Sequence, residues 1–136
     1  MYKRKIKQDL LCPLDYGRDA FGGKWKPRVL FVLSKHPSLR YSEIRKDMAD
    51  ITDSVLALVL KELTTYGMIS RKSYDEMPPR VEYSLTERGK SVIPVLQEIC
   101  RWSMRVYEED KERTLPQCNI CGCCQQRNGG AQENEQ

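Results

Sequence analysis

Four of the six cysteines in this chain of 136 residues crowd into the short segment CNICGCC. They are Cys118, Cys121, Cys123 and Cys124. The Cys-x-x-Cys pair has the spacing of a tetrahedral thiolate site, whereas the other two thiols are adjacent and hard to aim at one ion without strain. The metal alternatives are three thiolates plus water on Zn²⁺, the soft ion Cu(I), or a site shared between two chains. The remaining alternative is a flexible, thiol-rich tail with no resident metal.

The other two cysteines lie in very different surroundings. Cys12 precedes Pro13 near the start of the chain, whereas Cys100 follows Ile99 in an apolar stripe and is expected to be buried. A thiol reacts with oxidants when its thiolate is accessible and favoured by nearby positive charge, which Arg18 or a lysine of the N-terminal segment could supply. Cys12 is therefore a candidate for redox sensing, and a small buried residue is the alternative.

Patterns typical of an enzyme are missing from the sequence. The only histidine, His36, precedes Pro37 at the expected end of a helix, where a capping or surface role fits better than catalysis. A Cys-x-x-Cys redox motif normally opens a helix beside a βαβ unit, but here it follows the last predicted helix. No enzyme activity is predicted, and no cofactor is required.

Length and composition favour one folded domain with tails. With 40% apolar residues the chain supports one modest core. No apolar run approaches the roughly 20 residues needed to cross a bilayer, and no apolar segment follows the basic start. We therefore expect a cytoplasmic protein without a membrane partner. The predicted boundaries are a basic arm at 1–11, a domain at 12–112 and a mostly disordered Cys-rich tail at 113–136.

Three helices are predicted in the first half of the chain. Pro27 suits the first turn of a helix that contains the apolar run Val29–Leu33. Ser42 is the expected N-cap of a short second helix, and Thr52 that of the third. One side of the third helix is apolar, with Leu56, Val59, Leu60 and Leu63. The other side carries Ser54, Leu58, Lys61 and Thr65, and Gly67 ends the helix.

A hairpin and a long helix are predicted next. Residues 68–74 and 80–85 are expected to pair as two strands, because Val81, Tyr83 and Leu85 alternate with polar residues. A final helix starts at Thr86 and Glu87, and Pro94 should kink or split it.

This order of helices and strands predicts an α+β fold, mainly α: a winged helix-turn-helix with a two-stranded β wing. In such domains the second helix of the pair enters the major groove of DNA and the wing lies along the phosphates or reaches the minor groove. The charge supports a polyanionic partner, because residues 1–40 carry ten Lys or Arg against three Asp or Glu.

Several motifs, in order, strongly resemble the HxlR-type transcriptional regulators, which are relatives of the MarR group. They include GGKW, LKEL followed by GMISR, and PPRVEYSLTERG, and the resemblance covers roughly residues 12–107. It implies a bacterial DNA-binding regulator that acts as a homodimer on a palindromic operator, with terminal dimerisation helices. It also implies that Cys12 holds the position from which several such regulators sense a small-molecule oxidant or electrophile.

Candidate interface residues follow from these patterns. For double-stranded DNA they are Ser42, Thr52, Ser54, Leu58, Lys61, Thr65, Lys72 and Arg80. An ordinary solvated face is the alternative for those on the helix, and Leu58 could meet a thymine methyl group or pack against a neighbouring helix. For dimerisation they are Leu96, Ile99, Trp102, Ser103 and Val106, which could instead only close the chain's own core.

Two classes of function therefore compete. The first is a dimeric regulator of transcription with a thiol switch at Cys12. The second is a metal-responsive regulator, or a thiol- or metal-carrying protein, in which CNICGCC performs the chemistry. The sequence favours the first, because the cysteine cluster lies beyond the last predicted helix among Gln, Asn and Gly.

Overall fold

Five helices and three strands make up the part of the chain that the computed structural model describes, residues 12–109. The helices are α2 (Pro13–Phe21), α3 (Lys26–Ser34), α4 (Tyr41–Asp47), α5 (Asp53–Thr65) and α6 (Glu87–Glu109). The strands are β1 (Leu39–Arg40), β2 (Ile69–Tyr74) and β3 (Arg80–Leu85). The chain divides into two units, Met1–Ser91 and Val92–Gln136, and each is described by itself. The predicted arm and tail lie outside the described residues.

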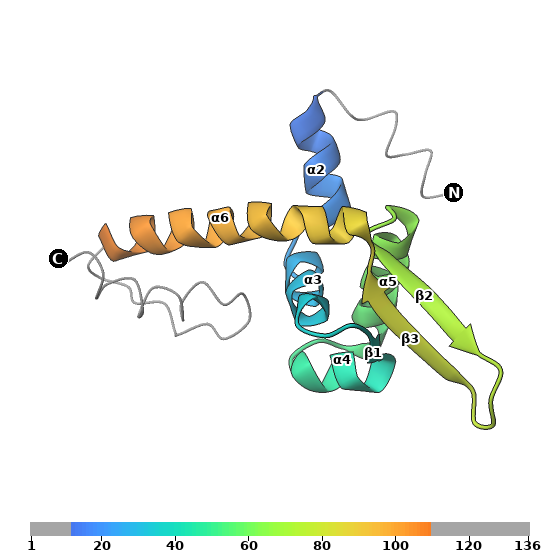
Figure 1. Cartoon of the computed structure of the whole chain (residues 1–136). Helices are drawn as coiled ribbons and strands as arrows, with labels where there is room; N and C mark the ends of the chain where they lie inside the picture. The colour runs from blue at the N-terminus through green and yellow to red at the C-terminus, as the bar shows by residue number, and fades with distance from the viewer. Residues whose placement is uncertain (1–11, 110–136) are drawn as a thin grey trace, which may run out of the picture. The chain divides into compact units, whose positions relative to one another are not determined.

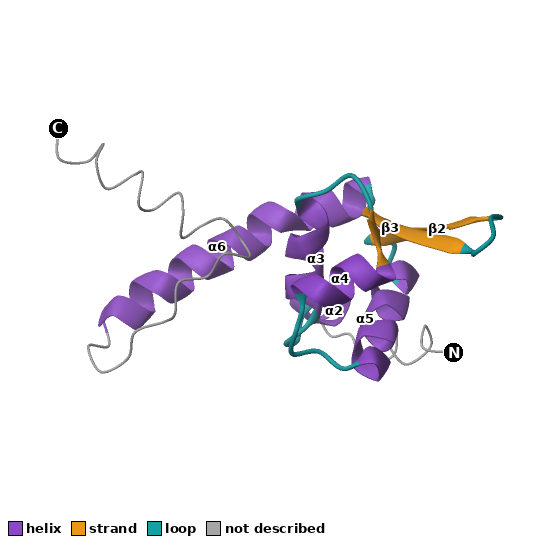
Figure 2. Ribbon diagram, turned by 90° about the horizontal axis from the view of Figure 1, so that it is seen from below, coloured by secondary structure: helices purple, strands orange, loops and turns teal. Residues whose placement is uncertain are grey.

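The helix-turn-helix pair consists of α4 and α5, and the hairpin of β2 and β3 projects beyond the helices of the first unit (Figures 1 and 2). The predicted winged fold is confirmed, with one addition. The short strand β1 joins β3, so that the antiparallel sheet has the order β1-β3-β2. Leu39 pairs with Tyr83, and Arg40 pairs with Glu82. A two-residue strand is too short to leave an alternating pattern in the sequence.

The core of the first unit lies under α5. Leu56, Leu60 and Leu63 are buried together with the apolar run of α3, because both helices have apolar side chains at the spacing of a buried face. Lys26 at the start of α3 forms an ion pair with Glu62 of α5, Nζ to Oε2 2.8 Å. Its ammonium also lies 5.4 Å from the centre of the Tyr66 ring. These contacts fix α5 on α3 and leave the opposite face of α5 exposed.

The predicted end of α5 is confirmed at Gly67, whose φ of +74° favours glycine. The TERG motif then fastens the start of α6 to this corner. The Thr86 hydroxyl donates to the carbonyl of Gly67 at 2.5 Å, and Arg88 donates to the carbonyl of Tyr66 at 2.9 Å. Gly89 is required here, because a Cβ atom would lie 2.0 Å from the carbonyl oxygen of Met68.

Three details of the expected elements were wrong or absent. Helix α2 was not predicted, and Ala20 is its only buried residue, so it has no buried apolar stripe for the sequence to show. Ser42 is not the N-cap of α4: Arg40 is, and its N–H donates to the Glu43 carboxylate at 2.9 Å, so the helix begins one residue before Ser42. Pro94 does not split α6, which runs as one helix from Glu87 to Glu109.

Candidate nucleic-acid interface

The turn between α4 and α5 is fixed by hydrogen bonds to the first residue of α5. Asp53 Oδ1 accepts from Arg45 Nε at 2.9 Å and from the Tyr41 hydroxyl at 3.1 Å. The Thr52 hydroxyl accepts from the backbone N–H of Val55 at 3.3 Å, which confirms Thr52 as the N-cap of α5. Arg45 and Tyr41 of α4 thus hold the N-terminus of α5, the helix that would enter the major groove.

Electrostatics support this arrangement. Hydrogen bonds from Arg45 and Tyr41 lower the pKa of the Asp53 carboxyl, so it stays ionised beside the positive end of the helix dipole. Burial, and then the hydrogen bond to Asp53, raise the pKa of the Tyr41 hydroxyl, which keeps it a donor. Arg45 therefore offsets the negative charge of Asp53 at the N-terminus of α5.

Side chains on the outer face of α5 lie where the sequence predicted. Ser54, Leu58 and Lys61 are exposed, and Thr65 is partly exposed. Ser42 is exposed on α4, and Thr52 is exposed at the turn. The structure brings these six predicted positions onto two adjacent elements, as a helix-turn-helix requires.

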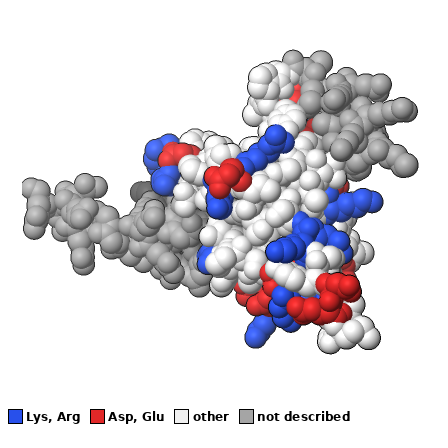
Figure 3. Space-filling view, turned by 45° about the vertical axis from the view of Figure 1, so that its right-hand side comes forward, with Lys and Arg blue, Asp and Glu red and all other residues white. Residues whose placement is uncertain are grey.

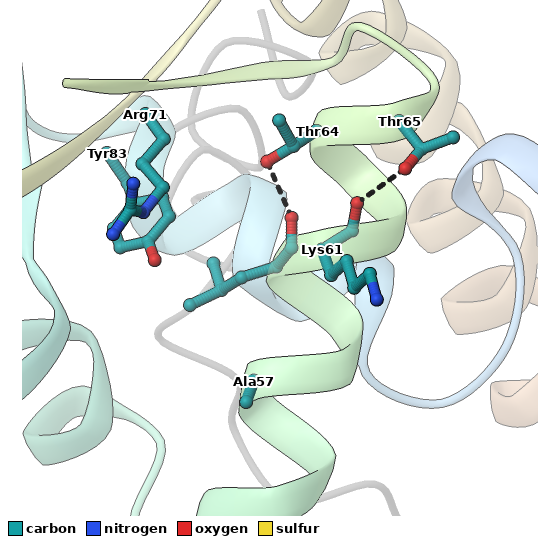
Figure 4. Close-up of a pocket in the computed structure, with 7 residues that line it drawn as sticks. Ala57, Lys61, Thr64, Thr65, Arg71 and Tyr83 are labelled. Atoms are coloured by element: carbon teal, nitrogen blue, oxygen red, sulfur yellow. Dashed lines mark hydrogen bonds between the residues drawn. The ribbon is translucent and has the colours of Figure 1, made fainter.

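A groove of about 280 Å³ runs between α5 and the wing (Figure 4). Its lining residues are Ala57, Leu60, Lys61, Thr64, Thr65, Arg71 and Tyr83. Arg71 and Tyr83 are paired across β2 and β3 and lie together on one side of the groove, facing α5. Within residues 12–109, no ion pair or hydrogen bond engages the Arg71 side chain. Arg71 is thus a basic group available beside the recognition helix.

Arg71 was not among the residues predicted from the sequence, whereas its neighbour Lys72 was. Successive residues of a strand point to opposite faces of the sheet, so the two side chains lie on different faces of the wing. Lys72 shares its face with Tyr74 and lies 4.9 Å from the centre of that ring. The cross-strand pairing of Arg71 with Tyr83 is the signal that identifies the face turned towards α5, and this signal needs the register of the hairpin.

Arg80, a predicted DNA contact, lies at the end of the hairpin and is engaged within the wing. It is the first residue of β3. Its Nη2 is 3.2 Å from Glu76 Oε1, its Nε is 3.5 Å from Glu82 Oε1, and its guanidinium carbon lies 4.0 Å from the centre of the Tyr74 ring. The hairpin register places Tyr74 directly opposite Arg80. Two carboxylates and one ring therefore hold this guanidinium in place.

The charge on one face of the molecule is mixed. On the face drawn in Figure 3, basic and acidic side chains lie next to one another in the lower part of the molecule, instead of forming one uniformly basic area. Contact with DNA would thus depend on the particular basic groups that no carboxylate neutralises. Lys61 and Arg71 are two of these within the described part of the chain.

Cys12 is the N-cap residue of α2, and its thiol-bearing side chain is exposed. Its backbone N–H donates to the Asp15 carboxylate at 3.1 Å. An exposed thiol is open to a reagent, so the buried alternative for Cys12 is excluded. Cys100 was expected to be buried and is only half-buried.

Along α6, four large apolar side chains are exposed: Val95, Ile99, Trp102 and Val106. Trp102 is 57% exposed and Ile99 is 50% exposed, and Ser103 is partly exposed. Leu96 differs, because only 3% of its surface is exposed. Leu96 therefore offers little surface to a second chain, and its place at a dimer interface stays a prediction.

The predicted metal ligands Cys118, Cys121, Cys123 and Cys124 lie outside the described residues. Within residues 12–109, no group of three or more His, Cys, Asp or Glu side chains could hold a metal ion. Of the described helices, none is long and apolar enough to cross a membrane.

Comparison with known proteins agrees with this geometry. The family model described as HxlR-like helix-turn-helix matches residues 20–111. An HTH-type transcriptional regulator of Methanothermobacter thermautotrophicus is 44% identical over 106 residues, which are 78% of this chain and 79% of that protein. Another, from Halalkalibacterium halodurans, is 36% identical over 104 residues, which are 76% of this chain and 92% of the relative.

Solved structures of similar proteins include two redox-related examples. The redox regulator HypR in its reduced form matches with a TM-score of 0.68 and 31% identity, over 75% of this chain and 100% of that one. The reduced form of the transcriptional regulator YodB from Bacillus subtilis matches with a TM-score of 0.62 and 30% identity, over 71% and 94%. The motifs, the winged helix-turn-helix and these matches agree: the chain belongs to the HxlR-like helix-turn-helix family of transcriptional regulators, which are not enzymes.

Proposed function

We propose that this regulator binds a palindromic operator as a homodimer, with α5 of each protomer in the major groove of one half-site. The observation that carries the proposal is the clamp of Arg45 and Tyr41 on Asp53, which fixes the N-terminus of α5 and leaves its outer face exposed. Residues near the start of the second helix contact base edges in helix-turn-helix domains. Ser54 and Leu58 occupy these positions.

Phosphate contacts would come from both sides of the groove beside α5. Lys61 on the helix and Arg71 on β2 are basic groups with no carboxylate partner among the described residues. Lys72 would add a contact from the other face of the wing. Such contacts position a protein on the duplex and make its affinity depend on salt.

The second chain of the dimer would cover the apolar side chains of α6. Val95, Ile99, Trp102 and Val106 fall at helical spacing, and each has at least two fifths of its surface exposed. Trp is a residue type that often dominates the binding energy of an interface. A second copy of the same chain offers the same four side chains, as a two-fold interface requires.

The proposed signal is oxidation or alkylation of Cys12. Two thiols can give two protons and two electrons to an oxidant such as diamide and form one disulfide, while a quinone adds a thiolate sulfur to a ring carbon. The exposed position of Cys12 supports this role. The names of the related structures, a redox regulator and a diamide-treated regulator, also support it. Modification would shift the spacing of the two recognition helices and change the affinity for DNA.

The test compares two cysteine variants of the full chain. A fluorescent duplex selected by the reduced protein is titrated before and after treatment with diamide. Cys12→Ser should bind this duplex like the unmodified protein and lose the response to diamide, whereas the matched control Cys100→Ser should keep the response. A Cys12→Ser variant that still responds like the unmodified protein would exclude the sensor role.

A further inference from the structure

The outer face of the recognition helix carries few groups that can make hydrogen bonds to bases. The exposed residues of α5 after Asp53 are Ser54, Ala57, Leu58, Lys61 and Thr64. No Arg, Asn or Gln occurs between Asp53 and Thr65. Arg and Lys make the bidentate contacts to guanine in the major groove, and Asn and Gln make those to adenine, so Lys61 is the only residue of these types on α5.

Most polar groups of α5 are also engaged within the protein. Asp53 is held by Arg45 and Tyr41, and Glu62 is held by Lys26. The hydroxyl of Thr64 donates to the carbonyl of Leu60 at 2.7 Å, and that of Thr65 donates to the carbonyl of Lys61 at 2.9 Å (Figure 4). Of the exposed side chains that follow Asp53 in the first two turns, Ser54 alone is polar, and its hydroxyl lies 3.4 Å from that of Thr52.

Leu58 and Ala57 occupy the centre of this face instead. Leu58 is 51% exposed, so it does not pack fully against a neighbouring helix. It lies in the second turn of α5, between Ser54 and Lys61 along the same face. The one apolar group that a base pair presents in the major groove is the C5 methyl group of thymine.

We propose that Leu58, with Ala57 beside it, recognises the C5 methyl group of a thymine in each operator half-site. The proposal rests on the proposed function, since it places α5 in the major groove. A buried pair of Leu58 and a methyl group removes both from water, which favours thymine over every unmethylated base. Sequence selection by this helix then comes mainly from an apolar contact, and Lys61 contributes affinity that is the same for thymine and uracil.

DNA is the partner that the neighbouring side chains favour. Lys61 follows Leu58 on the same face, and Arg71 lies across the groove that Ala57 lines. Cations on both sides of a small apolar centre match a base edge flanked by phosphates. An apolar protein partner would instead find an unpaired lysine and arginine at the margin of so small a patch.

The test replaces thymine by uracil, which removes only the methyl group and keeps base pairing. Duplexes are first selected from a random library by the full, reduced protein. Each thymine of the best duplex is then replaced in turn, and affinity is measured for the unmodified protein and for Leu58→Ala, Leu58→Met and Lys61→Ala. Leu58→Ala should fold normally, because the side chain is exposed and alanine favours helix, as melting followed by circular dichroism checks.

For at least one thymine in each half-site, replacement by uracil should weaken binding of the protein to the duplex about fourfold, which is the effect of one buried methyl group. Leu58→Ala should lose this difference, and Leu58→Met should keep most of it because the apolar volume is retained. Lys61→Ala should weaken binding to the thymine and uracil duplexes by the same factor.

The proposal would be overturned if the unmodified protein bound every uracil duplex as tightly as the thymine duplex. It would also be overturned if Leu58→Ala still distinguished uracil from thymine. Leu58→Ala could instead change the oligomeric state of the protein and leave its discrimination between thymine and uracil unchanged. That result would place Leu58 at a protein contact and would also overturn the proposal. If the selection enriches no duplex at all, the proposed DNA-binding function fails first, which separates the two results.

Discussion

Glu76→Gln should increase the affinity of this protein for DNA. Glu76 lies 3.2 Å from Arg80 at the end of the wing, and the side chains of Arg80 and Glu76 are 28% and 50% exposed. Such an exposed pair contributes about 0.2–1 kcal/mol to stability, so the variant should fold with at most a small drop in melting temperature. The substitution removes the negative charge of Glu76 and leaves Arg80 with one carboxylate partner instead of two.

The expected gain can be calculated for one wing. A carboxylate roughly 7 Å from a phosphate in water repels it by about 0.6 kcal/mol, which corresponds to roughly a threefold change in affinity for each half-site. If Arg80 then reaches a phosphate, the slope of log affinity against log salt should steepen by about 0.9 per wing. The assay is fluorescence anisotropy of a labelled duplex titrated at several NaCl concentrations.

Glu87→Gln is the matched control for this experiment. Glu87 is the first residue of α6, beyond the base of the hairpin, and lies 3.4 Å from Lys90 in a more exposed ion pair. The Glu87→Gln substitution removes the same charge but should leave the affinity for DNA and its salt slope unchanged. If Glu76→Gln behaves like this control, Glu76 does not restrain Arg80 from DNA, and the account of the wing is wrong.

Four further predictions concern other parts of the chain. Arg71→Ala should reduce the salt slope by about 0.9 per protomer, whatever the DNA sequence, because it removes one phosphate contact; an unchanged slope would exclude that contact. Asp53→Asn should lower stability at neutral pH, and the difference from the unmodified protein should vanish in acid. The reason is that a lowered pKa stabilises the folded state only above the range in which the carboxyl is protonated; denaturant titrations from pH 7 to pH 2 check this, and a constant difference would contradict it. Trp102→Ala should weaken the dimer by at least tenfold in sedimentation experiments, whereas Arg105→Ala, also exposed on α6, should not. Truncation after Leu115 should leave folding and DNA affinity intact and remove only a response to metal or oxidant that depends on the tail, and loss of basal DNA binding would show that the tail has a larger role.

Periodicity in the sequence was sufficient to predict both faces of α5. Leu56, Leu60 and Leu63 recur at the helical period, so the buried face and the exposed position of Leu58 followed before any coordinates. The cap at Thr52 could also be predicted, because a hydroxyl side chain just before an apolar helix is a local signal.

Features that depend on pairing between strands could not be predicted. The position of Arg80 between Glu76 and Glu82 depends on which residues face each other across the hairpin, and the sequence alone does not fix that register. The position of Arg71 beside α5 depends in addition on which face of the sheet the helix covers. For this reason Arg71 was not predicted, whereas Lys72 and Arg80 were, Arg80 because Pro78 and Pro79 stiffen the loop before it.

The most direct test of the central claim is selection of genomic DNA fragments by the full, reduced protein, followed by footprinting of the enriched fragments. The account predicts enrichment of fragments that contain an inverted repeat, with two protected half-sites about one helical turn apart, and a weaker enrichment after treatment with diamide. Recovery of fragments with no shared sequence and no symmetric footprint would contradict it.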